Sequence, residues 1–591
     1  MLAAAAALAL QIGALPLAAA EAAPGDLTFA ACLGGLIGCP GINPSGVTDG
    51  AAGVALSPDG RSLYLGAHFG SAVTHFTFDA AGNPSFESCI GNHSGCTVPG
   101  AASGALNGAR GVAVSSDGKQ LYAAAYGGNA ISHFTLDASG KPAFVGCVGN
   151  HAGCTAISAT AALNGVSRVS LSADGKHLYA AAPYNTTPAG RALSWFTLDA
   201  AGAPTFVGCF GAVTGCTAPA AYPPAVDGAS DIALSADGRN MYVASTTGAL
   251  FSDSNTVSHF TLDAAGTPTF ERCIGNHPGC TIPTPADAVF AASSIAVSAD
   301  GARLYVGANA DLAYFTLDAA GVPTFASCIG GLSGCTATTP AGLLFGAFGI
   351  KLGADGKQLY VASYGTDAIA HFSLGSSGAP TLVSCVGDLT GCAPTSPAGA
   401  VDGPFDFAVT RDGRRLYAAI YNGGLVDRFD IEQPPVAPAG PATPGQVVDV
   451  TAPTLKDYTL SRATFAAVSK GASIAVAAAA KAKVGTSIRY ALSEAATMAF
   501  RVERASGGRK VKGKCVKPSS TNRRGKRCRR YVALKGTVSH ASGIGRNSLK
   551  FSGRWRGRKL APARYALVAT ARDAAGNVSK PQRVSFKIVA R

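Results

Sequence analysis

The stretch Asp59-Gly60-Arg61-Ser62-Leu63-Tyr64 decides the fold, because the chain repeats its pattern seven times. Each copy reads Asp-Gly-x-x-Leu/Met-Tyr, and successive copies are 55 to 63 residues apart. The tyrosines that end the seven copies are Tyr64, Tyr122, Tyr179, Tyr242, Tyr305, Tyr360 and Tyr417. A repeat of this period indicates a solenoid, a propeller or an array of small domains.

A second repeated pattern, Cys-x6-Cys, is out of phase with the first. Its seven copies are Cys32 with Cys39, Cys89 with Cys96, Cys147 with Cys154, Cys209 with Cys216, Cys273 with Cys280, Cys328 with Cys335, and Cys385 with Cys392. A cysteine pair precedes the first Asp-Gly copy, and none follows the last. The offset indicates a closed ring.

Within one unit, short apolar or alternating runs are separated by turn residues, which predicts four antiparallel strands. A propeller blade needs about 40 to 45 residues, so we expect the surplus of each unit in the cysteine loop and the stretch after it. Residues 27–32 match the last-strand phrase at 323–328, whereas the seventh unit ends without a fourth strand. The sequence therefore predicts an all-β chain with a seven-bladed β-propeller, in which the N-terminal strand closes the last blade.

The phrase from Ser57 to Leu65, followed by the run from Val73 to Asp79, resembles the YVTN-type and lactonase-like seven-bladed propellers. The resemblance covers about residues 25–432 and implies the fold first, because one fold hosts many functions. The lactonase-like group includes enzymes that hydrolyse sugar lactones. The resemblance therefore implies one function to weigh against a binding role.

Charge divides the chain near residue 445. Residues 1–445 carry 16 Lys and Arg against 29 Asp and Glu, whereas residues 446–591 carry 32 against 5. The expected domains are the propeller at 25–432, a Pro-rich linker at 433–447 and a basic domain at 448–591. The last resembles the immunoglobulin-like or fibronectin-type modules of bacterial surface proteins, including the phrase Ala571-Arg572-Asp573-Ala574-Ala575-Gly576-Asn577, and a β-sandwich is expected.

The N-terminus and the cysteines both indicate export. Residues 2–20 are almost wholly apolar, and Ala20 and Ala22 form an Ala-x-Ala cleavage pattern, which predicts a signal peptide at 1–22. An uncleaved anchor helix is the alternative. The sixteen cysteines form eight close pairs, the eighth being Cys515 with Cys528, which is typical of an oxidising compartment. Each Cys-x6-Cys disulfide is worth roughly 2.5 kcal/mol by the chain-entropy estimate, and zinc is disfavoured because this is not a usual ligand spacing.

Between Arg509 and Arg530 the chain has eleven Lys or Arg residues and no acid, around Cys515 and Cys528. Such a run suits an anionic polymer, for example a cell-envelope glycopolymer, or a membrane surface. The alternative is a solvated run that balances the acidic propeller. Nucleic acid is disfavoured because the run has no aromatic side chain for base stacking.

When the units are aligned on the repeated Asp, most of them carry a small residue at two positions of the innermost strand, and a few carry a charged residue there instead. The departures are Arg168, Asp231 and Asp406 at six residues before the Asp, and Lys351 at four before it. These four are the predicted catalytic residues of an axial site. The alternative is that Arg168 with Asp231, and Lys351 with Asp406, form salt bridges between adjacent blades.

Two other aligned positions carry polar residues. Ten residues before the Asp, each followed by Gly, are Asp49, Asn107, Asn164, Asp227 and Asp402. This is first a turn signal, but such turns also lie near the channel mouth and are the predicted ligand-binding ring for a cation or sugar hydroxyls. A third series, His75, His133, Trp195, His259, Tyr314, His371 and Arg428, is expected to pack rather than bind metal, because it lies far from the axis.

The sequence thus predicts an extracellular or envelope-bound monomeric propeller that acts as a binding module without a cofactor. Its basic domain would tether it to anionic envelope polymers or carbohydrate, and a protein partner fits the same role. The alternative is a lactonase-like hydrolase. A solvent-filled axial pocket shared by three or more blades, including Arg168 and Asp231, would favour the hydrolase. Paired charges under a mouth capped by cysteine loops would favour binding at the rim.

Overall fold

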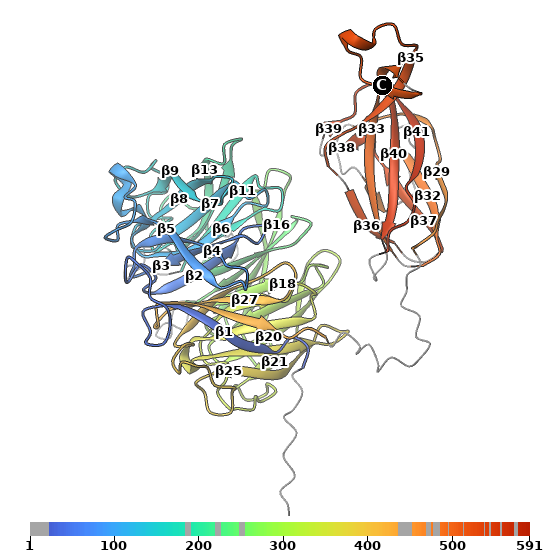
Figure 1. The fold of residues 1–591 in the computed structure, drawn as a ribbon. Coiled ribbons are helices and arrows are strands. Elements are labelled where there is room, and N and C mark those ends of the chain that lie inside the picture. Colours follow the sequence, from blue (N-terminus) through green and yellow to red (C-terminus); the bar gives the residue numbers. More distant parts are fainter. Residues whose placement is uncertain are drawn as a thin grey trace, which may run out of the picture. The chain divides into compact units, whose positions relative to one another are not determined.

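The chain divides into two compact units, Met1–Val436 and Ala437–Arg591, each built of β-strands (Figure 1). The computed structural model describes residues 23–183, 191–218, 226–246, 255–434, 452–468, 474–476, 485–494, 496–511, 513–536, 538–542, 545–555, 558–572 and 577–590. The predicted signal peptide, most of the predicted linker and residues 573–576 lie outside these ranges. Among the described residues, no helix is long and apolar enough to cross a membrane.

Seven four-stranded antiparallel sheets make up the described part of the first unit. The first three are β2 (Ala51–Leu56), β3 (Ser62–Ala67), β4 (Ala72–Phe78), β5 (Pro84–Gly91); β6 (Ala109–Val114), β7 (Gln120–Ala125), β8 (Ala130–Leu136), β9 (Pro142–Gly149); and β10 (Arg168–Leu171), β11 (His177–Ala182), β12 (Ala192–Leu198), β13 (Pro204–Gly211). The next three are β14 (Ala229–Leu234), β15 (Asn240–Ser245), β16 (Thr256–Leu262), β17 (Pro268–Gly275); β18 (Ser294–Val297), β19 (Arg303–Gly307), β20 (Asp311–Leu317), β21 (Pro323–Gly330); and β22 (Ala347–Leu352), β23 (Gln358–Ser363), β24 (Ala368–Leu374), β25 (Pro380–Gly387). Short 3₁₀ turns lie at Gly100–Leu106 and Tyr364–Thr366.

The seventh sheet joins the two ends of the unit. Its strands are β26 (Pro404–Val409), β27 (Arg415–Ile420), β28 (Leu425–Ile431) and the N-terminal β1 (Leu27–Gly34). β1 runs antiparallel to β28, with Leu27 opposite Ile431 and Gly34 opposite Leu425. The expected pairing of the N-terminal strand with the last sheet is therefore confirmed.

The sheets follow one another around a ring. The first strand of each sheet contacts the first strand of the next, and β26 of the seventh sheet contacts β2 of the first. Four-stranded sheets arranged in this way form a β-propeller, and the first strands line its axis. The ring leaves no first or last sheet without a neighbour.

The repeated tyrosines join neighbouring sheets. Each lies on the second strand of its sheet, is less than 2 % exposed, and donates its hydroxyl hydrogen to a glycine carbonyl of the next sheet. The last two of these bonds close the ring, since Tyr360 reaches Gly25 just before β1, and Tyr417 reaches Gly82 of the first sheet. The repeat that identified the fold is thus the contact between its sheets.

All eight predicted disulfides are present, and no described cysteine is free. Seven of them close the loop that follows the outermost strand of each sheet, and the eighth, between Cys515 and Cys528, lies in the second unit. The seven loop disulfides join Cys32 to Cys39, Cys89 to Cys96, Cys147 to Cys154, Cys209 to Cys216, Cys273 to Cys280, Cys328 to Cys335, and Cys385 to Cys392. These bonds exclude the cysteines as zinc ligands and indicate an oxidising environment.

The disulfide loops also meet their neighbours around the ring. Gly38, which precedes Cys39, packs closely against Pro397 of the segment that follows the sixth sheet. A side chain at position 38 would place its Cβ 3.2 Å from that proline. The same relation recurs one unit on, where an added Cβ on Gly95 would lie 3.0 Å from Pro44. These two loops are therefore held both by their own disulfides and by the segments beside them.

The second unit has one four-stranded sheet, one larger sheet and a two-stranded ribbon among its described residues. The four-stranded sheet holds β29 (Leu455–Leu460), β32 (Thr486–Leu492), β37 (Gly545–Phe551) and β31 (Ile474–Val476). The larger sheet holds β30 (Thr464–Ala466), β41 (Gln582–Val589), β40 (Ala563–Arg572), β33 (Ala496–Val511), β34 (Lys514–Val516), β35 (Arg527–Ala533) and β36 (Val538–Ser542); the ribbon is β38 (Arg554–Trp555) and β39 (Arg558–Lys559). Apolar side chains of both sheets, such as Ile488 and Phe500, form one buried cluster.

Candidate functional site

The first strand of most sheets is irregular where it begins. In β2, β6, β14, β22 and β26 the pairing with the second strand shifts in register near the first residues. Such a bulge breaks the alternation of side chains. Consecutive residues, such as Phe405 and Asp406, can therefore both reach the axis.

A pocket of about 330 Å³ lies at this end of the first strands. Its walls come from six of the seven sheets, and they are Arg110, Ser167, Arg168, Pro183, Ser230, Thr246, Ser293, Phe348, Tyr364, Phe405 and Tyr421. Each of these residues is the seventh or sixth before a repeated Asp or the ninth after it. The pocket is therefore axial, and no residue of the cysteine loops lines it.

Aromatic rings form one wall of the pocket. Phe405 lies 5.3 Å, centroid to centroid, from both Phe348 and Tyr421, and its ring is nearly parallel to that of Tyr421. Tyr364 contacts the same group and donates a hydrogen bond to Asn422, which in turn bonds to Asp402. This wall is apolar toward the pocket and anchored by polar contacts behind it.

Arg110 supplies a positive charge beside this aromatic wall. Its Nε donates to Nδ1 of His68 at 3.1 Å, its guanidinium lies 4.4 Å from the centre of the Tyr126 ring, and it hydrogen-bonds with Tyr421. No carboxylate among the described residues forms a salt bridge with Arg110. Burial, with the charge of Arg110 adding to it, lowers the pKa of His68 to about 4, so His68 is neutral and accepts this bond.

The four predicted catalytic residues do come together. Asp406 bonds to Arg168 at 3.3 Å and lies 3.6 Å from the ammonium of Lys351. Arg168 and Asp406 belong to the third and seventh sheets, so their bond crosses the axis. The backbone N–H groups of Val54 and Phe407 also donate to Asp406. The carboxylate of Asp406 is therefore the centre of the cluster.

Asp231 lies within electrostatic reach of this cluster but has no salt bridge of its own among the described residues. It accepts hydrogen bonds from the backbone N–H groups of Ile232 and Ile295. Burial raises the pKa of Asp231, and the positive charges of Arg168 and Lys351 offset only part of that effect. The predicted pair Lys351–Asp406 is thus present, whereas Arg168 pairs with Asp406 instead of Asp231, because the axis is narrow enough for a side chain to cross.

The predicted ring of Asp and Asn residues occupies turns at the same end of the sheets. Asp402 accepts a bond from Asn422, and Asp227 lies 3.9 Å from Arg191. Within the described ranges, no group of three His, Cys, Asp or Glu side chains is arranged to hold a metal ion. The ligand-binding role of Asp49, Asn107, Asn164, Asp227 and Asp402 stays a prediction.

The histidine series packs as expected. His75, His133, His259 and His371 each stack on the repeated tyrosine of the adjacent strand, at 5.1 to 5.3 Å between ring centres. In each, Nε2 contacts a polar side chain at the start of that strand, such as Asn240 for His259. These rings support the contact between the strands.

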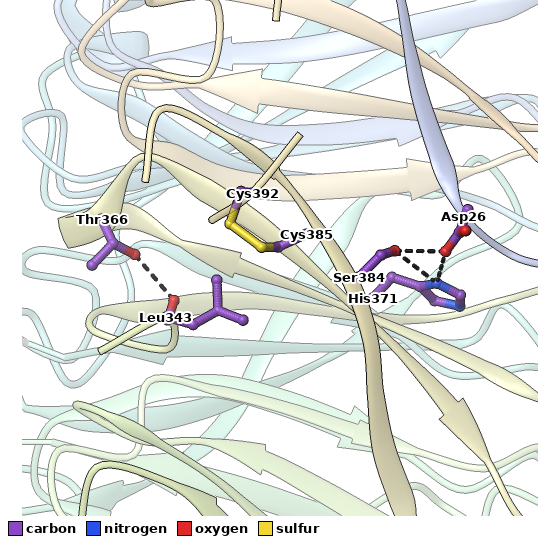
Figure 2. Close-up of a disulfide and its surroundings, with 7 residues drawn as sticks. All are labelled: Asp26, Leu343, Thr366, His371, Ser384, Cys385 and Cys392. Atoms are coloured by element: carbon purple, nitrogen blue, oxygen red, sulfur yellow. Dashed lines mark hydrogen bonds and ion pairs between the residues drawn. A yellow bond between two sulfur atoms is a disulfide. The ribbon is translucent and has the colours of Figure 1, made fainter. Parts of the chain in front are cut away.

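Asp26, His371 and Ser384 resemble a catalytic triad in composition only (Figure 2). Ser384 donates to Asp26 at 2.6 Å, and Asp26 meets Nδ1 of His371 at 3.1 Å, while Nε2 of His371 faces Gln358. In a triad the serine must meet the other ring nitrogen. The group instead ties the segment before β1 to the sixth sheet.

Two aligned positions that line the pocket were missed by the sequence analysis. Seven residues before the repeated Asp the units carry Ala52, Arg110, Ser167, Ser230, Ser293, Phe348 and Phe405; nine after it they carry His68, Tyr126, Pro183, Thr246, Asn309, Tyr364 and Tyr421. Strict alternation turns the first set away from the axis, and in five of the seven sheets a bulge brings it back. Their divergence in an otherwise uniform repeat was the available signal.

The basic run predicted at 509–530 forms the end of the larger sheet of the second unit. β33 pairs with both β34 and β35 there, and Cys515 and Cys528 are bonded. Eight described basic side chains of this run are exposed, namely Lys510, Lys514, Lys517, Arg523, Arg524, Lys526, Arg527 and Arg529. No described acid forms a salt bridge with them. The run is a free positive surface.

Solved structures similar to this chain are β-propellers, among them lactonase-like ones. A 6-phosphogluconolactonase-like protein from Bacteroides uniformis is 19 % identical, with a TM-score of 0.41 over 61 % of this chain and 87 % of that one. The periplasmic gluconolactonase of Pseudomonas aeruginosa is 18 % identical, with a TM-score of 0.41 over 57 % and 85 %. The propeller domain of Cps50 from Myceliophteria thermophila is 13 % identical, with a TM-score of 0.43 over 65 % and 97 %. No protein-family model and no curated protein sequence matches this chain.

Proposed function

We propose that residues 25–432 form a seven-bladed propeller that binds a small organic molecule in the pocket at its channel mouth. The observation that carries this proposal is that every wall residue comes from an aligned position at which the units differ. Elsewhere the units repeat the same tyrosine, disulfide and turn. Pockets that hold small ligands typically begin near 300 Å³, so the volume of about 330 Å³ suits a compact molecule.

Disulfides and charge support an exported binding module. Eight disulfides suit an oxidising compartment outside the cytosol. The seven exposed basic side chains between Lys514 and Arg529 suit attachment to an anionic envelope polymer by a basic domain, which we assign as an immunoglobulin-like β-sandwich. In this proposal the propeller presents its pocket to the surroundings while the second unit holds it at the cell surface.

One observation favours the alternative, a lactone hydrolase. Asp231 has a raised pKa and lies close to Arg168, whose guanidinium lines the pocket. A carboxylate of raised pKa can act as a general base at neutral pH, and a guanidinium can stabilise the oxyanion of a tetrahedral intermediate. Asp231 itself does not line the pocket, so a hydrolase would need a water molecule between it and the lactone.

The test of the pocket is a ligand-observed NMR screen of small carboxylates, sugars and lactones with the full chain. We expect hits whose binding weakens in Phe405→Leu and is unchanged in the control Val207→Ala, which alters an exposed side chain of an outer strand. Hits that ignore Phe405→Leu would contradict the proposal. Lactone hydrolysis that falls at least tenfold in both Asp231→Asn and Asp406→Asn would establish the hydrolase instead.

The test of the tether compares the full chain with the variant Lys514→Ser, Lys517→Ser, Arg523→Ser, Arg524→Ser. Retention on anionic cell-wall polymer should fall in the variant, and retention of the wild type should fall as salt is raised, because exposed charges are screened. Retention that persists at high salt, or in the variant, would contradict an electrostatic tether. The matched control, Arg239→Ser with Lys176→Ser, removes exposed charges from the propeller and should change nothing.

A further inference from the structure

Two arginines, Arg110 and Arg168, and no acid line the pocket, although the propeller as a whole is acidic. Arg168 and Lys351 lie close to two carboxylates, Asp231 and Asp406. Asp406 engages Arg168 and Lys351, and no described acid pairs with Arg110. Arg110 remains protonated at neutral pH because arginine ionises only far above it. At least one positive charge is therefore left without a counterion.

The protein holds this unpaired charge in one orientation. His68 fixes Nε, the ring of Tyr126 lies against the guanidinium, and the hydroxyl of Tyr421 bonds to it. Arg110 is among the residues that line the pocket. An arginine whose back and face are occupied in this way presents its remaining N–H groups as a fork, which matches a planar carboxylate in two parallel hydrogen bonds.

The serines of the pocket add one further donor. The hydroxyl groups of Ser230 and Ser293 donate to the backbone carbonyls of Ala292 and Ala347, each at 2.8 Å. Ser167 has no side-chain hydrogen bond within the described residues, and it lies beside Arg168 on the wall. A ligand oxygen near Arg110 can thus also accept from Ser167.

An aromatic wall adjoins the charge, since Tyr421 bonds to Arg110 and the guanidinium of Arg168 lies 5.4 Å from the centre of the Phe405 ring. Phe405 and Tyr421 stand nearly parallel, with an interplanar angle of 27°, and Phe348 and Tyr364 adjoin them. Rings of this kind favour offset or edge-to-face contact with another flat ring. A sugar acid, which is puckered and covered with hydroxyls, would make less contact with these flat faces than a planar ring does.

We infer that the ligand of the pocket is a small aromatic carboxylate, whose anionic group is bound by Arg110 and Ser167 and whose ring lies against Phe348, Phe405 and Tyr421. The inference rests on the proposed small-molecule site and names its ligand class. The carboxylate neutralises the unpaired charge of Arg110 and relieves its repulsion with Arg168. The aromatic wall supplies the selection among carboxylates.

The experiment titrates the full chain at low salt with benzoate and three analogues, by calorimetry and saturation-transfer NMR. Benzamide removes the charge, cyclohexanecarboxylate removes the flat ring, and gluconate presents a sugar acid. We expect benzoate to bind at least tenfold more tightly than each, because benzamide loses the charge-assisted hydrogen bonds and the other two analogues lack the flat ring. Inorganic phosphate should not displace it.

Two variants locate the binding. Arg110→Gln should weaken benzoate binding at least tenfold, whereas Arg239→Gln, an 82 % exposed side chain, should leave it unchanged. Phe405→Leu keeps the charge and should abolish the preference for benzoate over cyclohexanecarboxylate. Melting curves show whether each variant is folded, and if Arg110→Gln is not, Phe405→Leu and the benzamide comparison still decide.

The outcomes separate this inference from the proposed function. Benzamide binding as tightly as benzoate, or benzoate binding unaffected by Arg110→Gln, would overturn the inference. Preference for gluconate or phosphate would also overturn it while leaving a small-molecule pocket in place. If no compound of the wider screen responded to Phe405→Leu, the pocket itself would fall, and the inference with it.

Discussion

The contacts between the sheets and the residues of the channel mouth come from the same repeat. The first are identical from unit to unit, whereas the second differ. Between the sheets, all seven tyrosines occupy one position and make one kind of hydrogen bond. At the channel mouth, the aligned positions that line the pocket hold arginine, serine, threonine, phenylalanine, tyrosine and proline. A position that must serve the ring is repeated, and a position that serves one ligand differs from unit to unit. The comparison predicts stability effects in the first layer and binding effects in the second.

Removing one tyrosine of the inter-sheet layer should have the largest effect. Tyr242 is 1 % exposed and bonds to Gly321 of the next sheet. Tyr242→Ala should lower the free energy of unfolding by about 4 kcal/mol through the cavity it leaves, whereas Tyr242→Phe should cost about 1 kcal/mol, for the hydrogen bond alone. Urea denaturation measures both. Equal losses in the two variants would show that the ring of Tyr242 contributes little.

Most of this layer could be predicted from the sequence. The periods of the tyrosines and cysteines indicated the strands, the disulfides and the pairing of β1 with β28, because each depends on local turns and on a count of units. The channel mouth could be predicted less well. Phe348 and Phe405 reach the axis through a bulge, and a bulge depends on how the strand meets its neighbours rather than on its own alternation.

The pairing inside the channel shows the same limit. Aligned sequences show which side chains lie on the innermost strands, and Arg168, Asp231, Lys351 and Asp406 were identified in this way. They do not show which partner each selects, because that depends on the width of the axis. Arg168 bonds to Asp406 across the ring. The sequence had suggested a salt bridge between Arg168 and Asp231 of the adjacent sheet instead.

Breaking the axial cluster should have the next largest effect on stability. The side chains of Arg168 and Asp406 are 12 % and 14 % exposed, so Asp406→Asn leaves a largely buried guanidinium without its counterion. We expect a loss of about 3 kcal/mol, at the lower end for a disrupted buried pair since Lys351 is partly solvated. The control Asp174→Asn, in a surface pair with Lys176, should change stability by less than about 0.5 kcal/mol. A similar value for both variants would show that the axial cluster is no stronger than a surface pair.

Lowering the pH should reduce the stability of the layer between the sheets through its buried histidines. Each histidine should contribute less than the axial cluster does. Burial lowers the pKa of His75, His133, His259 and His371 below the unfolded value of 6.5. The unfolded chain then binds more protons, so their contribution to stability is lost as the pH falls below about 6.5. His259→Tyr, which copies Tyr314 of the next sheet, should therefore show a smaller drop in melting temperature between about pH 7.5 and pH 5 than the wild type. An identical drop in both would exclude His259 from the effect.

The smallest effect on stability should come from Asp427, a buried residue that departs from the repeat. Here a substitution should raise stability, whereas the substitutions above lower it. One aligned position on the third strand of each sheet is buried and holds a hydroxyl side chain in four sheets. These residues are Thr74, Ser132, Ser194 and Ser258, and the seventh sheet has Asp427 at the same position. Asp427 is fully buried, and neither carboxyl oxygen has a hydrogen-bond partner in the described structure. Burial raises the pKa of Asp427 well above 3.8, so its cost to stability appears as the pH rises above that value.

Asp427→Ser should therefore stabilise the protein by about 1 kcal/mol near neutral pH, because it removes an unsatisfied buried carboxyl group. The hydroxyl can follow Thr74, which donates to a backbone carbonyl. The gain should shrink toward pH 4, where Asp427 is protonated in the folded and, increasingly, in the unfolded chain. Urea denaturation of variant and wild type at both pH values measures it. A loss of stability at neutral pH would mean that Asp427 has a partner that only the native protein supplies, and that the difference at this position serves a ligand, as differences at the channel mouth do.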